Sequence, residues 1–228
     1  MDGIRYSVER TRNRASRAVL RDGTVLIRLA RGLTGSEEQK HVELLLRRMA
    51  KVCAREAMKI PIDPFAPLLE GSETAHIDLV TGSMVSMRVT SGRRTKAMRM
   101  SGGWSVVRGL TADDATFRRF LWKLVSASGQ DDIEKAVHTI NAETFRAPIR
   151  SVSLKFMKSR WGSCSTFGDI AISTPLLCTT PAIFRYVVIH ELAHILHPNH
   201  SAQFWRTVEA QDSGYRLRVK ELKGFKLP

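Results

Sequence analysis

Residues 181–200 read PAIFRYVVIHELAHILHPNH, and their pattern predicts a buried helix. Thr179 or Thr180 can cap this helix with a side-chain oxygen. Pro181 suits the first helical position, because the N–H group that proline lacks would be unpaired there. Apolar residues then recur at helical spacing to about residue 196.

Two histidines on this predicted helix can hold one metal ion. Four residues advance a helix by about 400°, so His190 and His194 lie on one face, about 6 Å apart along the axis. Glu191 lies one position further, where its carboxylate can reach a water held by the ion. Zinc lowers the pKa of such a water towards 7, and Glu191 can take its proton and pass it to the leaving amine. The pattern therefore predicts a zinc-dependent metallopeptidase that hydrolyses peptide bonds with a Glu-activated, zinc-bound water.

The alternative is a pair of core histidines satisfied by hydrogen bonds. The HExxH pattern arises by chance in about one chain per hundred of this size, so its setting matters. On a buried apolar helix, an uncommitted glutamate beside two histidines would be costly. The metal site is therefore favoured.

The third zinc ligand must come from the residues that follow. A catalytic zinc usually has three protein ligands and one open position, and the candidates are His197, His200, Glu209 and Asp212. His197 lies about 10 Å along the axis from His190, which is too far for two ligands of one ion. Pro198 disfavours helical geometry at the residue before it, and Asn199 tolerates positive φ, so the chain can turn and return His200 to the metal. We therefore favour His200.

Glu209 remains the alternative third ligand. Ser201 can cap a second helix, in which Phe204, Trp205 and Val208 form a packing face. Glu209 falls on that helix, and gluzincins take a ligand from a following helix.

The remaining sequence predicts an α+β fold in three parts. Residues 1–60 predict two or three antiparallel strands, with Asp22-Gly23 as a hairpin turn, and then a helix from Ser36. Residues 61–113 hold short β-like segments broken by glycines, which we interpret as a β-rich insertion. The catalytic core over 114–228 begins with two helical patterns, 117–127 and 133–145, followed by strands over 151–156 and 169–172 and a loop over 161–165. We expect one minimal zincin-like domain over 1–228, with a small, mainly antiparallel sheet.

Composition narrows the class of protein. No N-terminal apolar run and no stretch of about 18 apolar residues occurs, so we expect no membrane segment and a cytoplasmic location. Cys53, Cys164 and Cys178 lack CxxC spacing, which favours buried, reduced thiols over a disulfide framework. Lys and Arg number 36 against 22 Asp and Glu, which favours acidic partners or substrates.

Nucleic acid is the alternative partner. Residues 84–108 contain six basic residues, no acid and Trp104, and the first 31 residues hold eight arginines against three acids. In this alternative the protein binds DNA or RNA and zinc is structural, or a protease is recruited to DNA. A solvated hairpin is the simpler explanation of residues 84–108, because a run of charge usually needs no partner.

Three linked motifs resemble the YgjP-like metallopeptidase family, which is related to SprT-like and WLM proteases. They are RWGSC at 160–164, HELAH at 190–194, and NHS followed by FW at 199–205. The resemblance implies a minimal zincin in which His190, His194 and His200 bind zinc and Glu191 is the catalytic base. Residues 61–113 have no counterpart that we recognise.

The resemblance also implies how a protein or peptide substrate binds. In zincins an edge strand above the metal helix pairs with an extended substrate, and the segment over 163–172 is the candidate here. Arg160, Trp161 and Ser163 are the candidate substrate-binding residues, although Trp161 can equally pack in the core. Arg160, Tyr215 and His197 are the candidates for stabilising an oxyanion.

Overall fold

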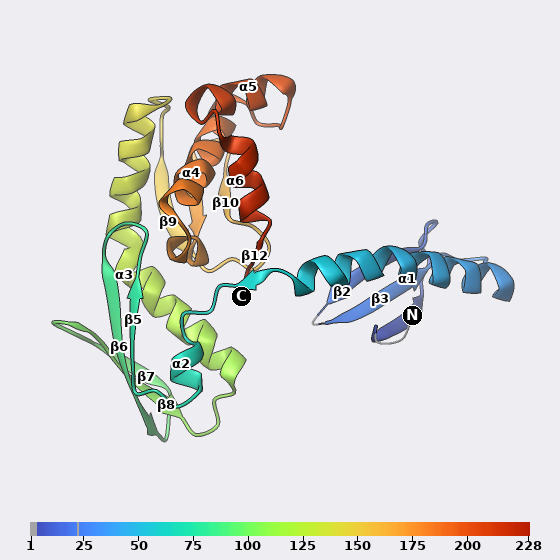
Figure 1. Ribbon diagram of the computed structural model, residues 1–228, viewed down its shortest axis with the longest axis horizontal. Coiled ribbons are helices and arrows are strands. Elements are labelled where there is room, and N and C mark those ends of the chain that lie inside the picture. Colours follow the sequence, from blue (N-terminus) through green and yellow to red (C-terminus); the bar gives the residue numbers. More distant parts are fainter. Residues whose placement is uncertain (1–3, 22) are drawn as a thin grey trace. The chain divides into compact units, whose positions relative to one another are not determined.

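The computed structural model describes residues 4–21 and 23–228, and the chain forms two compact units, Met1–Ile60 and Pro61–Pro228 (Figure 1). Helices and small sheets occur in both units, which confirms the α+β class. None of the helices in the described part of the chain has the length and apolarity needed to cross a membrane.

The first unit packs one long helix against a three-stranded sheet. Its elements are β1 (Tyr6–Arg10), β2 (Arg17–Arg21), β3 (Thr24–Leu29) and α1 (Gly35–Ala57). Side chains alternate across the central strand β3. Val25, Ile27 and Leu29 are therefore buried on one face, where they form a core with Met49 of α1.

Two predictions for this unit need correction. β2 and β3 form the predicted antiparallel hairpin, with Gly23 at a φ of 73°, whereas Asp22 lies outside the described residues. β1, however, is parallel to β3, because β3 inserts between β1 and β2. The cap of α1 is Thr34 rather than Ser36, since the Glu37 carboxylate accepts hydrogen bonds from both the backbone N–H and the hydroxyl of Thr34.

Residues predicted as broken β segments form one four-stranded sheet in the second unit. After β4 (Ile60–Pro61) and α2 (Ala66–Leu69), the strands are β5 (Thr74–Asp78), β6 (Met84–Gly92), β7 (Lys96–Met100) and β8 (Gly103–Gly109). Their order is β5-β6-β8-β7, with β6 and β8 parallel. As in the first unit, the last strand inserts between two earlier ones.

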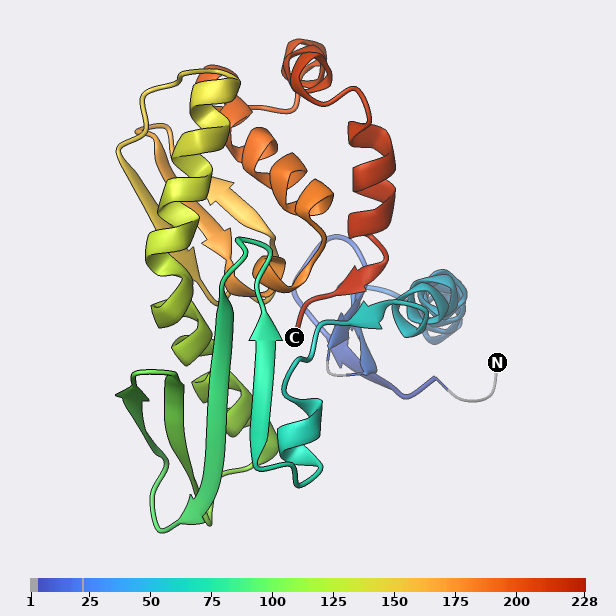
Figure 2. The same cartoon turned by 60° about the vertical axis from the view of Figure 1, so that its left-hand side comes forward.

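A single helix, α3 (Asp114–Glu143), runs along this sheet and continues past the next one (Figures 1 and 2). The Trp104 indole of β8 donates a hydrogen bond to Ser128 of α3 at 2.8 Å. The prediction of two helices is wrong, because α3 continues through Asp131 and Asp132, which resembled the start of a helix. Buried residues on both sides of the aspartates, from Phe117 to Ile140, hold α3 to one core.

The third sheet is mixed rather than mainly antiparallel. It consists of β9 (Ser151–Lys155), β10 (Gly162–Cys164) and β11 (Asp169–Ser173), in the order β10-β11-β9. β11 is antiparallel to β10 and parallel to β9, because it inserts between them after two chain reversals. The predicted loop over 161–165 therefore contains β10, an edge strand.

The C-terminal helices pack against this sheet. A 3-10 helix, η1 (Thr174–Cys178), leads to α4 (Pro181–Leu196), α5 (Ala202–Gln211), α6 (Tyr215–Leu222) and β12 (Phe225–Lys226). α4 contacts β10, β11, α3, α5 and α6 (Figure 2). Near the end of the chain, the Lys226 carbonyl accepts a hydrogen bond from the Ile62 N–H at 3.2 Å.

Candidate metal centre

Local signals fix both ends of α4. The Thr180 hydroxyl accepts a hydrogen bond from the Ile183 N–H at 3.3 Å, and Pro181 is the first helical residue. At the other end, His197 is extended, with φ −136° and ψ 100°, and its N–H donates to the Ala193 carbonyl at 2.9 Å. The predicted helix is confirmed, with Thr180 as its cap.

A tight turn after α4 returns the chain towards the helix. The Asn199 carbonyl accepts a hydrogen bond from the Ser201 N–H at 2.9 Å. The Ser201 hydroxyl in turn accepts one from the Phe204 N–H at 3.3 Å and so caps α5. His200 lies in this turn, between the two helices.

Three imidazoles meet beside this turn. One ring nitrogen from each of His190, His194 and His200 lies within 4.8 Å of the others, and the Nε2 atoms of His190 and His200 are 3.1 Å apart. Two nitrogens bound to one tetrahedral zinc ion at about 2.0–2.1 Å lie roughly 3.4 Å apart. The cluster therefore fits a single ion of this size.

Neighbouring groups orient two of the rings. The Nδ1 atom of His194 lies 3.3 Å from the His197 carbonyl oxygen. Since a carbonyl can only accept, Nδ1 carries the hydrogen and leaves the Nε2 lone pair for a metal. The Tyr186 hydroxyl lies 3.5 Å from Nδ1 of His190.

Aromatic side chains of α5 enclose the cluster. The Phe204 ring centroid lies 5.0, 4.7 and 4.8 Å from those of His190, His194 and His200. The Trp205 ring stacks on that of His200, with centroids 5.6 Å apart and an interplanar angle of 21°. Tyr215 of α6 in turn stacks on Trp205, with centroids 5.4 Å apart. Packing against α5 therefore holds the exposed third histidine.

Glu191 is buried beneath β10. The residue is 6% exposed, and burial raises the pKa of Glu191 to about 7, although the charge of Arg160 acts in the opposite direction. A Cβ atom on Gly162 would lie 2.6 Å from Oε1 of Glu191. A side chain at position 162 would therefore force the Glu191 side chain or β10 to shift.

A pocket of about 350 Å³ joins these groups. Burial lowers the pKa of His190 to about 4, and burial also lowers that of His194. Both imidazoles are therefore neutral at pH 7, as a metal ligand must be. The pocket is lined by residues of α4, of the turn after it and of the segment around β10: Arg160, Gly162, Ser163, Cys164, Ser165, Thr166, His190, Glu191, His194, Pro198 and His200.

A family model described as YgjP-like, metallopeptidase domain, matches residues 13–225. The chain belongs to this family. Among solved structures, it is similar to the metallopeptidase zymogen of Pyrococcus abyssi abylysin, with 23% identity and a TM-score of 0.33. That match covers 43% of this chain and 98% of the other. No curated protein matches the chain significantly.

Membership of the YgjP-like metallopeptidase family implies a metal ion, and the donor set suits one. Among the described residues, His190, His194 and His200 form the group of side chains that could hold it. Cys164 lines the pocket, but burial, followed by the charges of Glu191 and Asp169, raises the pKa of its thiol to about 11. It is therefore neutral at pH 7 and a poor ligand.

Some of the other predicted site residues line the pocket and some do not. Arg160 and Ser163 line it, whereas Trp161 is partly buried and packs against the core. His197 turns its ring to Thr207, with Nε2 and Oγ1 3.1 Å apart.

The competing acidic ligands are engaged elsewhere. A Glu209 oxygen accepts a hydrogen bond from Arg216 at 2.5 Å. An Asp212 oxygen accepts one from the Gly214 N–H at 3.0 Å. Neither acid joins the three histidines.

Sequence reasoning missed the contacts of Gly162 and of the α5 aromatics. Phe204 and Trp205 follow His200 by four and five residues. Since Ser201 signals a helix start, an aromatic pair one turn later could have been recognised as a wall of the site. The role of Gly162 depends on tertiary contact with α4, so no local pattern reveals it.

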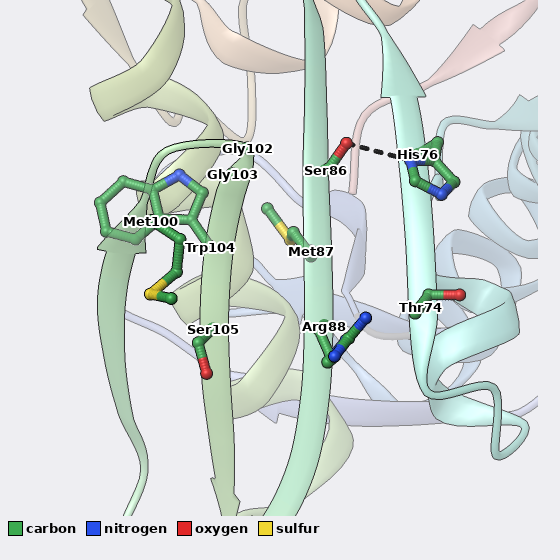
Figure 3. Close-up of a pocket in the computed structure, with 10 residues that line it drawn as sticks. All are labelled: Thr74, His76, Ser86, Met87, Arg88, Met100, Gly102, Gly103, Trp104 and Ser105. Atoms are coloured by element: carbon green, nitrogen blue, oxygen red, sulfur yellow. Dashed lines mark hydrogen bonds between the residues drawn. The ribbon is translucent and has the colours of Figure 1, made fainter.

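A second cavity, of about 380 Å³, lies on the four-stranded sheet and shares no lining residue with the metal pocket (Figure 3). His76 of β5 and Ser86 of β6 are hydrogen-bonded there at 3.0 Å, next to Arg88. Two basic side chains of the same sheet contact other residues of the protein. Arg99 lies over the Trp104 ring, and Arg108 pairs with an acid at the start of α3.

Proposed function

We propose that this metallopeptidase uses zinc held by His190, His194 and His200, with Glu191 as general base and acid. The observation that carries the proposal is the meeting of three imidazoles and one buried carboxyl group in a single open pocket. When bound, zinc would supply a Lewis acid that polarises a substrate carbonyl and makes water more acidic.

Glu191 has the environment that proton transfer requires. Burial brings the pKa of Glu191 to about 7, so that near neutral pH the carboxyl group can both accept and give up a proton. A carboxyl group with such a pKa can accept a proton at Oε1 or Oε2 from an attacking water and return it to the leaving amine nitrogen. Gly162 keeps the space that the carboxyl group needs.

Arg160 is the best supported of the three candidates for stabilising the oxyanion. It lines the pocket and is close enough for its charge to lower the pKa of Glu191. His197 faces Thr207 instead, and the Tyr215 ring is stacked on Trp205. A cation beside a developing negative charge favours the transition state.

The unpaired edge of β10 supports the proposed mode of substrate binding. Among the strands in the described part of the chain, β10 pairs with β11 alone, and Ser163 lies in its middle. An extended peptide can add to such an edge through backbone hydrogen bonds. We therefore propose exposed or unfolded protein segments as substrates and cleavage within the chain.

The rival function, nucleic-acid binding with structural zinc, fits this centre less well. Structural zinc sites are closed by four protein ligands, whereas a catalytic site has three and an open position. The three histidines beside a pocket match the second description.

Metal content and cleavage of an unfolded protein test the proposal together. We expect one zinc per chain and cleavage that a chelator abolishes and added zinc restores. His200→Ala should lose both zinc and activity, whereas Glu209→Gln should keep both. Loss of zinc from Glu209→Gln but not from His200→Ala would refute the proposed ligand set.

A further inference from the structure

The solvent-facing side of α1 carries a row of positively charged side chains. We call this row the α1 stripe. It consists of Lys40, Arg47, Arg48, Lys51 and Arg55, all of which are exposed. Because an α-helix turns by about 100° per residue, these five side chains fall within an arc of about 100° and span roughly 22 Å of the helix axis.

The opposite side of α1 is already occupied. Its apolar residues, among them Leu45 and Met49, pack against β3, which lies along the helix (Figure 1). Leu44 is the exposed apolar residue within the arc of the stripe. A helix that binds a membrane surface needs a free apolar face, so α1 is poorly suited to a lipid partner.

Most charges of the α1 stripe lack acidic partners. Glu43 accepts a salt bridge from Arg47 at 2.7 Å. Within residues 4–21 and 23–228, the other members form no salt bridge. Lys51 also lies four residues from both Arg47 and Arg55, and like charges at this spacing destabilise a helix. A bound polyanion would relieve that repulsion.

The charge of the whole chain is concentrated in the same unit. Residues 1–60 contain 14 of the 36 lysines and arginines but only 7 of the 22 acids, so about a quarter of the chain carries half of the net charge of +14. A strongly uneven distribution of this kind attracts polyanions over a long range.

We propose that the α1 stripe binds the phosphate backbone of double-stranded nucleic acid. Each strand of a duplex offers one phosphate about every 3.4 Å of axis, so about six phosphates of one strand match the length of the stripe. Protein surfaces usually mix both signs of charge, whereas the arc of the stripe from Lys40 to Arg55 contains no acid. Contacts to phosphates carry no base sequence, so binding is independent of sequence. The inference does not rest on the peptidase proposal.

Binding of a fluorescein-labelled 20-base-pair DNA duplex, followed by anisotropy between 50 and 200 mM salt, tests this surface. Five phosphate contacts predict a slope of about −4.5 in log K against log salt, which is roughly a 500-fold loss over that range. Lys51→Glu/Arg55→Glu should reduce the slope by about 2 and weaken binding at least about tenfold at 100 mM salt.

A matched control lies on α3. Arg119 and Lys123 are exposed and also four residues apart, so Arg119→Glu/Lys123→Glu makes the same change in net charge on another helix. This variant should keep the wild-type slope to within about 0.5. The neutral pair Lys51→Gln/Arg55→Gln, checked for helix content by circular dichroism, should lower the slope as the reversed pair does, which separates loss of contacts from loss of fold.

Three results would overturn the inference. They are absence of duplex binding at 50 mM salt, equal losses in the α1 and α3 variants, and tighter stripe-dependent binding to polyglutamate or to phosphatidylserine vesicles. Glu191→Gln leaves the stripe intact and should bind the duplex like the wild type, so the outcome for this surface and the outcome for peptidase activity can be distinguished.

Discussion

His200 depends on aromatic packing more than the other two histidines do. It is exposed, and no protein group in the described residues accepts a hydrogen bond from its Nδ1 atom, whereas Trp205 stacks on its ring at 5.6 Å. Groups around a metal ligand typically change metal affinity by about 10- to 100-fold. Trp205→Ala should therefore weaken zinc binding about tenfold, and Trp205→Phe should keep most of the affinity. Competition with a chromophoric chelator measures both, and wild-type affinity in Trp205→Ala would show that stacking does not hold His200.

Gly162 controls the position of the proposed base. Because a Cβ there would lie 2.6 Å from Oε1 of Glu191, Gly162→Ala must displace the carboxyl group or β10. A displacement of about 1 Å can cost 10²-fold in rate. We expect kcat to fall about 10- to 100-fold with zinc content unchanged. Gly102→Ala, where an added Cβ meets no atom within 4 Å, is the matched control, and equal rates in the two variants would contradict the proposed contact.

At the scale of elements, one carboxylate ties the third sheet together. Asp169 of β11 accepts hydrogen bonds from Arg150, just before β9, from Ser151 at the start of β9, and from Ser165 after β10. The Arg150 guanidinium, and then the two hydroxyls, lower the pKa of Asp169 to about 2. This network positions the edge strand that lines the metal pocket.

Acid should weaken this network within a defined range. Because folding lowers the pKa of Asp169, its contribution is complete above about pH 4, the range of an unfolded aspartate, and is lost as the pH falls towards 2. Asp169→Asn should lower the thermal midpoint at pH 7 and should differ progressively less from wild type below pH 4. Asp131→Asn, on the exposed side of α3, serves as the control. A constant difference between wild type and Asp169→Asn from pH 7 to pH 3 would argue against the assigned pKa.

Elements with local signals were predictable, whereas those set by distant pairing were not. Thr180 and Pro181 announce α4 in the sequence, and Ser201 announces α5. By contrast, β10 has only three residues and exists because it pairs with β11, which no local pattern reveals. The parallel pairing of β1 with β3 also depends on distant contacts, because β3 inserts between β1 and β2 in the sheet.

In the candidate site, too, the local features could be predicted from the sequence and the tertiary contacts could not. His190 and His194 share a helix face by periodicity, and Pro198 and Asn199 made the return of His200 plausible. The approach of Gly162 to Glu191 joins residues 29 positions apart and depends on how β10 crosses α4. Such contacts belong to tertiary packing.

At the scale of the whole molecule, the proposed nucleic-acid-binding surface and the candidate metal centre belong to different parts of the chain. The metal pocket lies within residues 61–228, and the α1 stripe lies within residues 1–60. Variants in one unit should therefore leave the assay of the other unchanged, as Glu191→Gln and Lys51→Glu/Arg55→Glu can show when each is tested for both cleavage and duplex binding.

The most direct test of the central claim is cleavage of an unfolded protein by zinc-loaded wild type and Glu191→Gln, with zinc content measured in the same samples. General acid–base catalysis contributes about 10²- to 10⁴-fold, so the variant should keep one zinc per chain and lose at least about 100-fold in turnover. Full turnover by Glu191→Gln with zinc bound would contradict the role assigned to Glu191.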